Sequence, residues 1–131
     1  MKGETNLKKL LQNMSPELQE GDYVFCTVPE VKAEFFSIII GLFREKEGWT
    51  IVTRKEAAEQ YKLACSSEMA WITLNIHSAL EAVGLTAAIS NALAKHHISC
   101  NVVAAYYHDH IFIPKADAQR ALAILNDVSL R

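Results

Sequence analysis

The first stretch of the chain alternates between short apolar stripes and turn-forming residues. Near the N-terminus, four apolar residues recur with the spacing i, i+3, i+4, i+7, namely Leu7, Leu10, Leu11 and Met14. This spacing predicts a short amphipathic helix, which Ser15-Pro16 ends because proline disfavours helical backbone in the residue before it. Residues Asp22–Val28 are rich in β-branched and aromatic side chains and predict a strand, which Pro29 ends.

A second apolar run follows and predicts a helix. Phe35, Ile38, Ile39, Leu42 and Phe43 recur at helical spacing. Arg44–Glu47 would continue this helix as a solvated turn, and Gly48 would end it. Phe35, Phe36 and Phe43 are expected in the core, although Phe36 and Ile40 lie off the main stripe and could contact a second chain.

A strand and a helix complete the first half. Trp49–Val52 predicts a short strand, and Thr53 with Glu56 has the spacing of a capping box for a helix over Arg54–Tyr61. Residues Lys62–Glu68 carry no periodic signal. We therefore expect two parts, residues 1–68 and residues 69–131.

The second half has a clearer pattern. Its first strand alternates apolar with mixed positions from Met69 onward: Ala70, Ile72, Leu74 and Ile76 against Trp71, Thr73, Asn75 and His77. After a loop over Ser78–Gly84, the residues Leu85, Ala88, Ile89, Ala92 and Leu93 mark an amphipathic helix. Strands are predicted over Ile98–Tyr106 and His110–Ile113, with a tight turn at Tyr107–Asp109. Pro114 opens a last helix whose core-facing residues are Ala118, Ala121, Leu122 and Leu125.

The order of these elements indicates the fold class. The first half reads strand, helix, strand, helix, and the second reads strand, helix, strand, strand, helix. Strands separated by helices need cover on at least one face, which predicts an α+β sandwich with helices on one side of a largely antiparallel sheet. The two halves share the order of their elements but little residue-by-residue identity, so a tandem repeat is indicated by that order alone.

Composition narrows the class of protein. The 131 residues are half hydrophobic, and the formal net charge of −2 comes from scattered charges of both signs. This argues against nucleic acid as a partner. The N-terminus is too polar for a signal peptide, and no window approaches the roughly 20 apolar residues that span a bilayer. Cys26, Cys65 and Cys100 form no CxxC pair, which fits a reducing compartment. We expect a soluble cytoplasmic protein.

Two runs of the second half carry a family resemblance. The run Ile72–Ile89, with Gly84 at the entry to its helix, resembles the start of an ACT domain, and Ile98–Pro114 resembles the second and third strands of the same domain. The chain is similar to bacterial ACT-like proteins with two tandem halves, which are related to the ACT regions of aspartate kinases and to arginine-sensing regulators. The match is good over residues 69–126 and loose over 20–61. It implies a ferredoxin-like βαββαβ sandwich that binds a small molecule, typically an amino acid, between ACT units.

The loop before the second-half helix is the first candidate site. A loop that enters a helix leaves backbone N–H groups free, and with the helix dipole these groups suit a carboxylate. Glycine allows a ligand close to the backbone. The candidate ligand-binding residues here are Ser78, Val83, Gly84, Leu85 and Thr86. The alternative is structural, with Ser78 and Glu81 capping a local turn and Gly84 only fitting a bend.

Asp109 and Asn101 are the other candidates. Asp109 could accept charge-assisted hydrogen bonds from the ammonium group of an amino acid, and Asn101 on the adjoining strand could assist. The alternative is that Asp109 only makes the turn, as aspartate often does.

The sequence favours binding over catalysis. His108 and His110 could converge on one side of a strand, but no third metal ligand has suitable spacing, so no metal and no cofactor are expected. No GxSxG, P-loop or GxGxxG motif is present. We expect a regulatory amino-acid-binding module that is not an enzyme and forms a homodimer. The alternatives are a structural or protein-interaction domain of the same fold and, more remotely, a small enzyme that uses His108 or His110 as a base.

Overall fold

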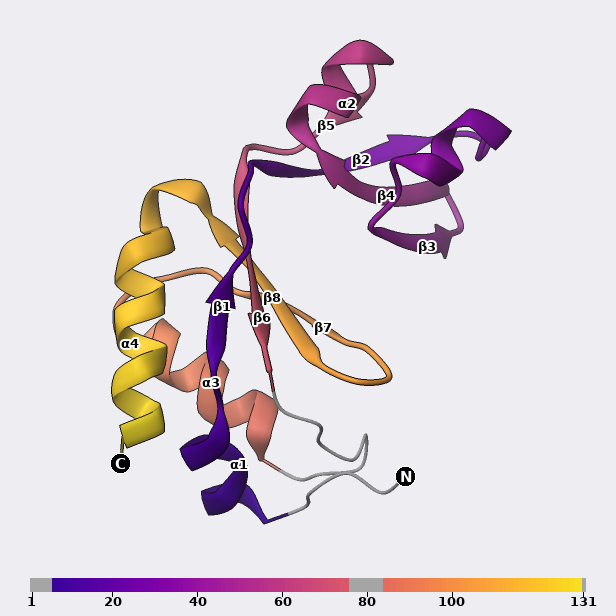
Figure 1. Cartoon of the computed structure of the whole chain (residues 1–131). Helices are drawn as coiled ribbons and strands as arrows, with labels where there is room; N and C mark the ends of the chain where they lie inside the picture. The colour runs from indigo at the N-terminus through magenta and orange to yellow at the C-terminus, as the bar shows by residue number, and fades with distance from the viewer. Residues whose placement is uncertain (1–5, 76–83, 131) are drawn as a thin grey trace. The chain divides into compact units, whose positions relative to one another are not determined.

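The computed structural model describes residues 6–75 and 84–130, and it divides the chain into two compact units (Figure 1). One unit, here called the inserted unit, is Gly21–Met69. The other, here called the outer unit, joins Met1–Glu20 with Ala70–Arg131. Each unit is described by itself. Within the described ranges, no helix is both long and apolar enough to cross a bilayer.

The outer unit has a sheet in the order β1-β6-β8-β7. Strand β1 pairs antiparallel with β6, from Pro16 opposite Leu74 to Leu18 opposite Ile72, and β7 pairs antiparallel with β8. The elements of this unit are α1 (Leu7–Asn13), β1 (Pro16–Leu18), β6 (Met69–Leu74), α3 (Leu85–Ala94), β7 (Asn101–Ala104), β8 (Asp109–Pro114), the 3-10 turn η2 (Lys115–Asp117) and α4 (Ala118–Leu130).

The helices of the outer unit cover one face of its sheet. The side chains that enter the core alternate along the strands, so that Ile72 and Leu74 of β6 and Ile111 and Ile113 of β8 point to the same side. They form one core with buried residues of the helices: Leu10, Leu85, Ile89, Leu93, Ala118, Ala121 and Leu125. The alternation predicted from Met69 is confirmed over residues 70–74, while Ile76 and His77 lie outside the described residues. In the last helix Ala118, Ala121 and Leu125 are buried as predicted, but Leu122 is half-buried and does not belong to this core.

The inserted unit has a sheet in the order β3-β4-β2-β5, with every pairing antiparallel. Its core gathers six buried residues: Val24, Cys26, Val28, Phe35, Ile51 and Ala58. The elements are β2 (Tyr23–Val28), the 3-10 turn η1 (Ala33–Ser37), β3 (Gly41–Glu45), β4 (Gly48–Arg54), α2 (Lys55–Gln60) and β5 (Ala64–Cys65). This is a complete strand, helix, strand, strand, helix, strand repeat, with η1 in place of the first helix.

The predicted helix over the Phe35–Phe43 run is wrong. Residues 33–37 form a single 3-10 turn, and the run then enters strand β3 at Gly41. Residues 41–45 pair as a strand with β4, from Gly41 opposite Val52 to Glu45 opposite Gly48, while Ile38, Ile39 and Ile40 lie between η1 and this strand. Phe35 is buried in the core as expected, but Phe36 and Phe43 are 64% and 71% exposed.

Two further local predictions in this region are also wrong. Gly48 does not end a helix; it closes the β3–β4 hairpin opposite Glu45, with φ +146°. Thr53 does not cap α2, which has Arg54 as its N-cap with no side-chain hydrogen bond. The hydroxyl of Thr53, buried in β4, donates instead to the carbonyl of Ile38 at 2.9 Å. This bond ties the end of η1 to the sheet.

The first residues of the chain differ from the expected division at residue 68. Residues up to Glu20 belong with the C-terminal half because β1 pairs with β6 and because Leu10 and Met14 are buried in the outer core. The second half supplies strand, helix, strand, strand and helix, and β1 from the start of the chain adds the fourth strand. Each unit thus has the four strands of a βαββαβ sandwich.

Candidate ligand-binding site

Helix α3 begins with a glycine in a left-handed conformation. Gly84 is the N-cap, with φ 92° and ψ −12°, and the first intrahelical bond runs from the amide of Ala88 to the carbonyl of Gly84 at 2.9 Å. The amides of Leu85, Thr86 and Ala87 precede this bond and have no acceptor within the helix. Since glycine carries no capping side chain, these amides suit an external anion.

The space around Gly84 also requires glycine. A Cβ atom at this position would lie 3.3 Å from Cδ2 of Leu7 in α1, and its φ is one that residues with a side chain rarely adopt. Leu85 is buried in the core and fixes the start of the helix, whereas Thr86 is exposed. The first turn of α3 therefore has no side-chain cap, and the buried Leu85 side chain fixes its position.

Asp109 is a buried carboxylate at the first position of β8. It lies opposite Ala104 and is 7% exposed. The tight turn that joins β7 to β8 lies before Asp109 in the chain. The amide of Ala105 donates to the carbonyl of His108 at 3.0 Å across that turn. Asp109 is in phase with Ile111 and Ile113, so its side chain belongs to the helix-covered side of the sheet. The interpretation of Asp109 as a turn residue is therefore wrong.

Asn101 and Asp109 are not brought together. Asn101 begins β7 opposite Phe112, at the other end of the hairpin from the Ala104–Asp109 pair. Opposed residues in an antiparallel pair share a face, and the alternation along each strand then places Asn101 on the face opposite Asp109. Asn101 is exposed. Assistance from Asn101 to a group bound at Asp109 does not fit this register.

Asp109 and the start of α3 lie at one end of the outer unit. Strands β6 and β8 are neighbours and run in opposite directions (Figure 1). The first residue of β8 therefore lies toward the end of the sheet at which β6 finishes, before the chain enters α3. Of the predicted residues, Gly84, Leu85, Thr86 and Asp109 belong to this end, while Ser78 and Val83 lie outside the described residues.

The opposite face of the same sheet carries a polar network that the sequence did not predict. The indole Nε1 of Trp71 donates to Nδ1 of His110 at 3.0 Å, and the Oγ1 of Thr73 lies 3.1 Å from the same nitrogen. The side-chain amide of Gln19 donates to Thr73 Oγ1 at 3.0 Å. The ring of Trp71 also stacks on Phe112, with centroids 5.9 Å apart. The sequence feature that could have indicated this network is the presence of Trp71 and Thr73, whose side chains carry polar groups, at the positions that alternate with the apolar ones.

This network favours the neutral form of His110. Nδ1 accepts from the Trp71 indole, so a proton on that nitrogen would face another donor. Burial lowers the pKa of His110 below its ordinary value of 6.5, the nearby His108 lowers it further, and Asp109 partly opposes both effects. The rings of His108 and His110 are 6.5 Å apart. Among the described residues, no group of three or more His, Cys, Asp and Glu side chains is placed to hold a metal ion.

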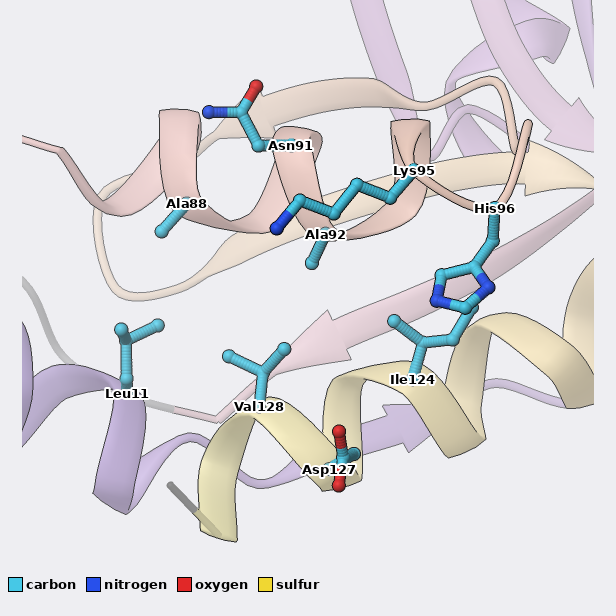
Figure 2. A pocket seen from close by; sticks show the side chains of 9 residues that line it. All are labelled: Leu11, Ala88, Asn91, Ala92, Lys95, His96, Ile124, Asp127 and Val128. Carbon is cyan, nitrogen blue, oxygen red and sulfur yellow. The ribbon is translucent and has the colours of Figure 1, made fainter.

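A groove of about 410 Å³ lies between α3 and α4 (Figure 2), and Asp109 does not line it. Apolar residues from α1, α3 and α4 form part of its lining: Leu11, Ala88, Ala92, Ile124 and Val128. The polar side chains around it, Asn91, Lys95, His96 and Asp127, are exposed. This groove offers no buried charge to select a zwitterion, so the end of the unit with Asp109 and Gly84 is the better candidate.

Two sequence models of the ACT domain match the chain, one over residues 2–70 and the other over residues 66–127. None of the curated protein sequences matches it. The two matched stretches follow each other with a short overlap at residues 66–70 and together extend over both units.

Solved structures agree with this assignment. A protein of unknown function from Vibrio cholerae, described as a possible transport protein, is 52% identical, with a TM-score of 0.85 over 95% of this chain and 97% of that chain. A protein from Agrobacterium tumefaciens is 15% identical, with a TM-score of 0.72 over 88% and 89% of the two chains. The regulatory subunit of aspartate kinase from Thermus thermophilus is 10% identical, with a TM-score of 0.64 over 87% and 97%, and shows the same fold. The chain belongs to the ACT-domain family and contains two ACT domains in tandem.

Proposed function

We propose that this protein is a regulatory module, without catalytic activity of its own, that binds an amino acid at the end of the outer unit where α3 begins. The observation that carries the proposal is the combination of a glycine-capped helix start with the buried carboxylate of Asp109. The amides of Leu85 and Thr86 would receive the ligand carboxylate. Asp109 would receive its ammonium group.

The electrostatics of this end suit a zwitterion. The positive end of the α3 dipole favours an anion within its first turn. A carboxylate that is shielded from water makes stronger charge-assisted hydrogen bonds than an exposed one, which favours Asp109 as the partner of an ammonium group. The exposed hydroxyl of Thr86 adds a polar group to the carboxylate end.

Ligand binding to such a module would exert its regulatory effect by changing the module's interaction with another protein or its oligomeric state. A ligand shifts an equilibrium only when it binds one state better than the other. The similarity to the regulatory subunit of an aspartate kinase supports a regulatory role, and one similar structure, of aspartokinase III from E. coli, is a complex with aspartate and ADP. We place the protein in the cytoplasm and expect a homodimer.

A thermal-shift screen of the whole chain against the twenty amino acids tests this proposal. A ligand that binds only the folded state raises the melting temperature as its concentration rises. For any amino acid that does so, Asp109→Asn should weaken binding about tenfold or more, because the charge-assisted bond is lost. The matched control is Asp117→Asn, which removes a carboxylate paired with Arg120 at the surface of the same unit and should leave affinity unchanged. No shift with any amino acid at millimolar concentration, or equal effects of the two variants, would contradict the proposal.

Exposed apolar side chains favour a second candidate function, that of a protein-interaction domain. Phe36 and Phe43 are largely exposed, and Ile40 and Leu42 are 38% and 42% exposed. Strand β3 pairs only with β4 within the inserted unit, so its other edge is open to a partner. Light scattering on the wild-type protein and on Phe43→Ser tests self-association through this surface. A measured mass equal to that of one chain for the wild-type protein would exclude the homodimer.

A further inference from the structure

Two of the three cysteines of the chain face each other across neighbouring strands. Cys26 in β2 and Cys65 in β5 are direct partners in the antiparallel register. They are far apart in the sequence, and all three cysteines of the chain are free thiols. The cross-strand pair is therefore a product of the fold of the inserted unit.

The local hydrogen bonds show which kind of cross-strand pair this is. The amide of Ser66 donates to the carbonyl of Phe25 at 2.9 Å, and the amide of Phe25 donates to the Ser66 hydroxyl at 3.0 Å. Phe25 and Ser66 thus occupy a hydrogen-bonded position, and the adjacent pair, Cys26 and Cys65, occupies a non-hydrogen-bonded one. The Cα atoms of such pairs lie about 4.5 Å apart with their side chains close, within the range of about 4.4–6.8 Å that a disulfide bridges.

The two thiols interact but differ in their access to solvent. Cys26 is 2% exposed, whereas Cys65 is exposed. Burial is the main cause that raises the pKa of the Cys26 thiol to about 11, and the electrostatic interaction and hydrogen bond with Cys65 raise it further. Cys26 is therefore a protonated thiol at neutral pH, and Cys65 is the sulfur that a reagent in solution reaches first.

A hollow of about 300 Å³ gives small reagents access to Cys65 beside Cys26. It is lined by Phe25, Cys26, Thr27, Thr50, Ala64 and Cys65, so both cysteines border the same space. Apart from the two cysteines, its side chains carry no ionisable group. The hollow therefore presents no charged side chain that would repel an anionic disulfide reagent.

We propose that Cys26 and Cys65 form a reversible dithiol site that closes to an intramolecular disulfide by exchange with a small-molecule disulfide of the glutathione class. Cys65 loses its proton to solvent, and its thiolate attacks the oxidised reagent. This attack forms a mixed disulfide on Cys65 and releases one glutathione thiolate. Cys26 then loses its proton to solvent and attacks the Cys65 sulfur, which forms the Cys26–Cys65 bond and releases the second thiolate. Two protein thiols are oxidised, and one small disulfide is reduced to two thiols.

The closed bond would tie the last strand of the inserted unit to the first. Strand β5 is only two residues long, and Cys65 is its second residue. The bond would enclose η1, β3, β4 and α2 in one covalent loop. A cross-link over a loop of this length restricts the unfolded chain and raises the stability of the fold.

The test uses the full-length protein incubated with oxidised glutathione at pH 8 and analysed by intact mass and by non-reducing peptide mapping. We expect loss of two hydrogen atoms, a peptide linking Cys26 to Cys65, and a rise of about 5 °C or more in melting temperature that dithiothreitol reverses. In Cys26→Ser, Cys65 should stop at the mixed disulfide with one added glutathione. Cys100→Ser should form the same bond as the wild type.

Two results would overturn the proposal. One is a wild-type protein in which Cys65 carries glutathione and never proceeds to the Cys26–Cys65 bond. The other is a protein in which Cys65 links only to a second chain. If Cys26→Ser folds poorly, Cys26→Ala gives the same reading, because the site in the core is small and apolar.

Discussion

The indole nitrogen of Trp71 and the Nδ1 nitrogen of His110 lie 3.0 Å apart, and the indole donates the hydrogen bond. The two residues come from β6 and β8, which are neighbours in the sheet of the outer unit. An indole N–H can only donate, so this bond exists only while Nδ1 of His110 carries no proton. The folded state therefore selects neutral imidazole.

The burial of His110, together with this bond, predicts a dependence of stability on pH. The pKa of His110 is lowered in the folded protein, so below about pH 6.5 the unfolded chain binds a proton at this residue that the folded chain does not yet bind. The stabilising contribution is complete above the unfolded pKa and is lost as the pH falls from there through the folded pKa. Urea unfolding between pH 5 and 8 measures it as a falling free energy of unfolding on the acid side.

Two variants isolate the contribution of His110. His110→Gln should flatten the acid limb, and Trp71→Phe should reduce it, because His110 then loses the donor that opposes its protonation. His96→Gln is the matched control, since it removes an exposed histidine of the same unit that takes no part in the Trp71–His110 hydrogen bond. An acid limb of wild-type steepness in His110→Gln would show that His110 is not its cause.

Gly84→Ala tests the backbone at the start of α3. The variant would hold alanine at φ 92° and bring its Cβ to 3.3 Å from Leu7 Cδ2. We expect a loss of about 1–2 kcal/mol in the free energy of unfolding, since the left-handed region costs this much for a residue with a side chain. The double variant with Leu7→Ala removes the contact but keeps the strained φ. If Gly84→Ala unfolds like the wild type, the helix start is less constrained than we infer.

Gly48→Ala tests the hairpin of the inserted unit. Its Cβ would lie 2.9 Å from the carbonyl oxygen of Val28, at φ 146°, so the backbone itself must move. We expect a loss of about 1–3 kcal/mol. Gly41→Ala on the same hairpin is the control, because its Cβ would meet Val52 at an ordinary 3.5 Å. Chemical denaturation of both variants should separate them clearly, and equal losses would contradict the assigned backbone.

The sequence predicts the fold well where the two faces of an element differ in polarity. The alternation from Ala70 to Leu74 gives strand β6 directly, because the core positions Ala70, Ile72 and Leu74 are separated by Trp71 and Thr73, which carry polar groups. The Phe35–Phe43 run fails for the opposite reason. Strand β3 lies at the edge of its sheet and is exposed over most of its length, so burial imposes no period of two and the chance helical spacing dominates.

The candidate site shows a similar division between local and long-range information. Gly84 is predictable because its role depends on the helix that follows it in the chain. The separation of Asn101 from Asp109 depends on the register of β7 against β8, and the Trp71–His110 bond depends on the pairing of β6 with β8. Neither pairing can be read from local patterns, because a shift of one residue moves every side chain to the other face.

A contact between distant parts of the chain gives the last prediction, which concerns Leu10. This residue of α1 is 2% exposed in the core of the outer unit, together with Leu74, Leu85 and Leu125 from the C-terminal half. Leu10→Ala should therefore lower the free energy of unfolding of the outer unit by about 2–5 kcal/mol. Lys9→Ala, at the exposed neighbour on the same helix, should change it by less than about 0.5 kcal/mol. Hydrogen exchange locates the effect. Amides of β6 and β8 should lose protection in Leu10→Ala while those of β2 and β4 keep it, and equal losses in both sets would mean that the two units unfold as one.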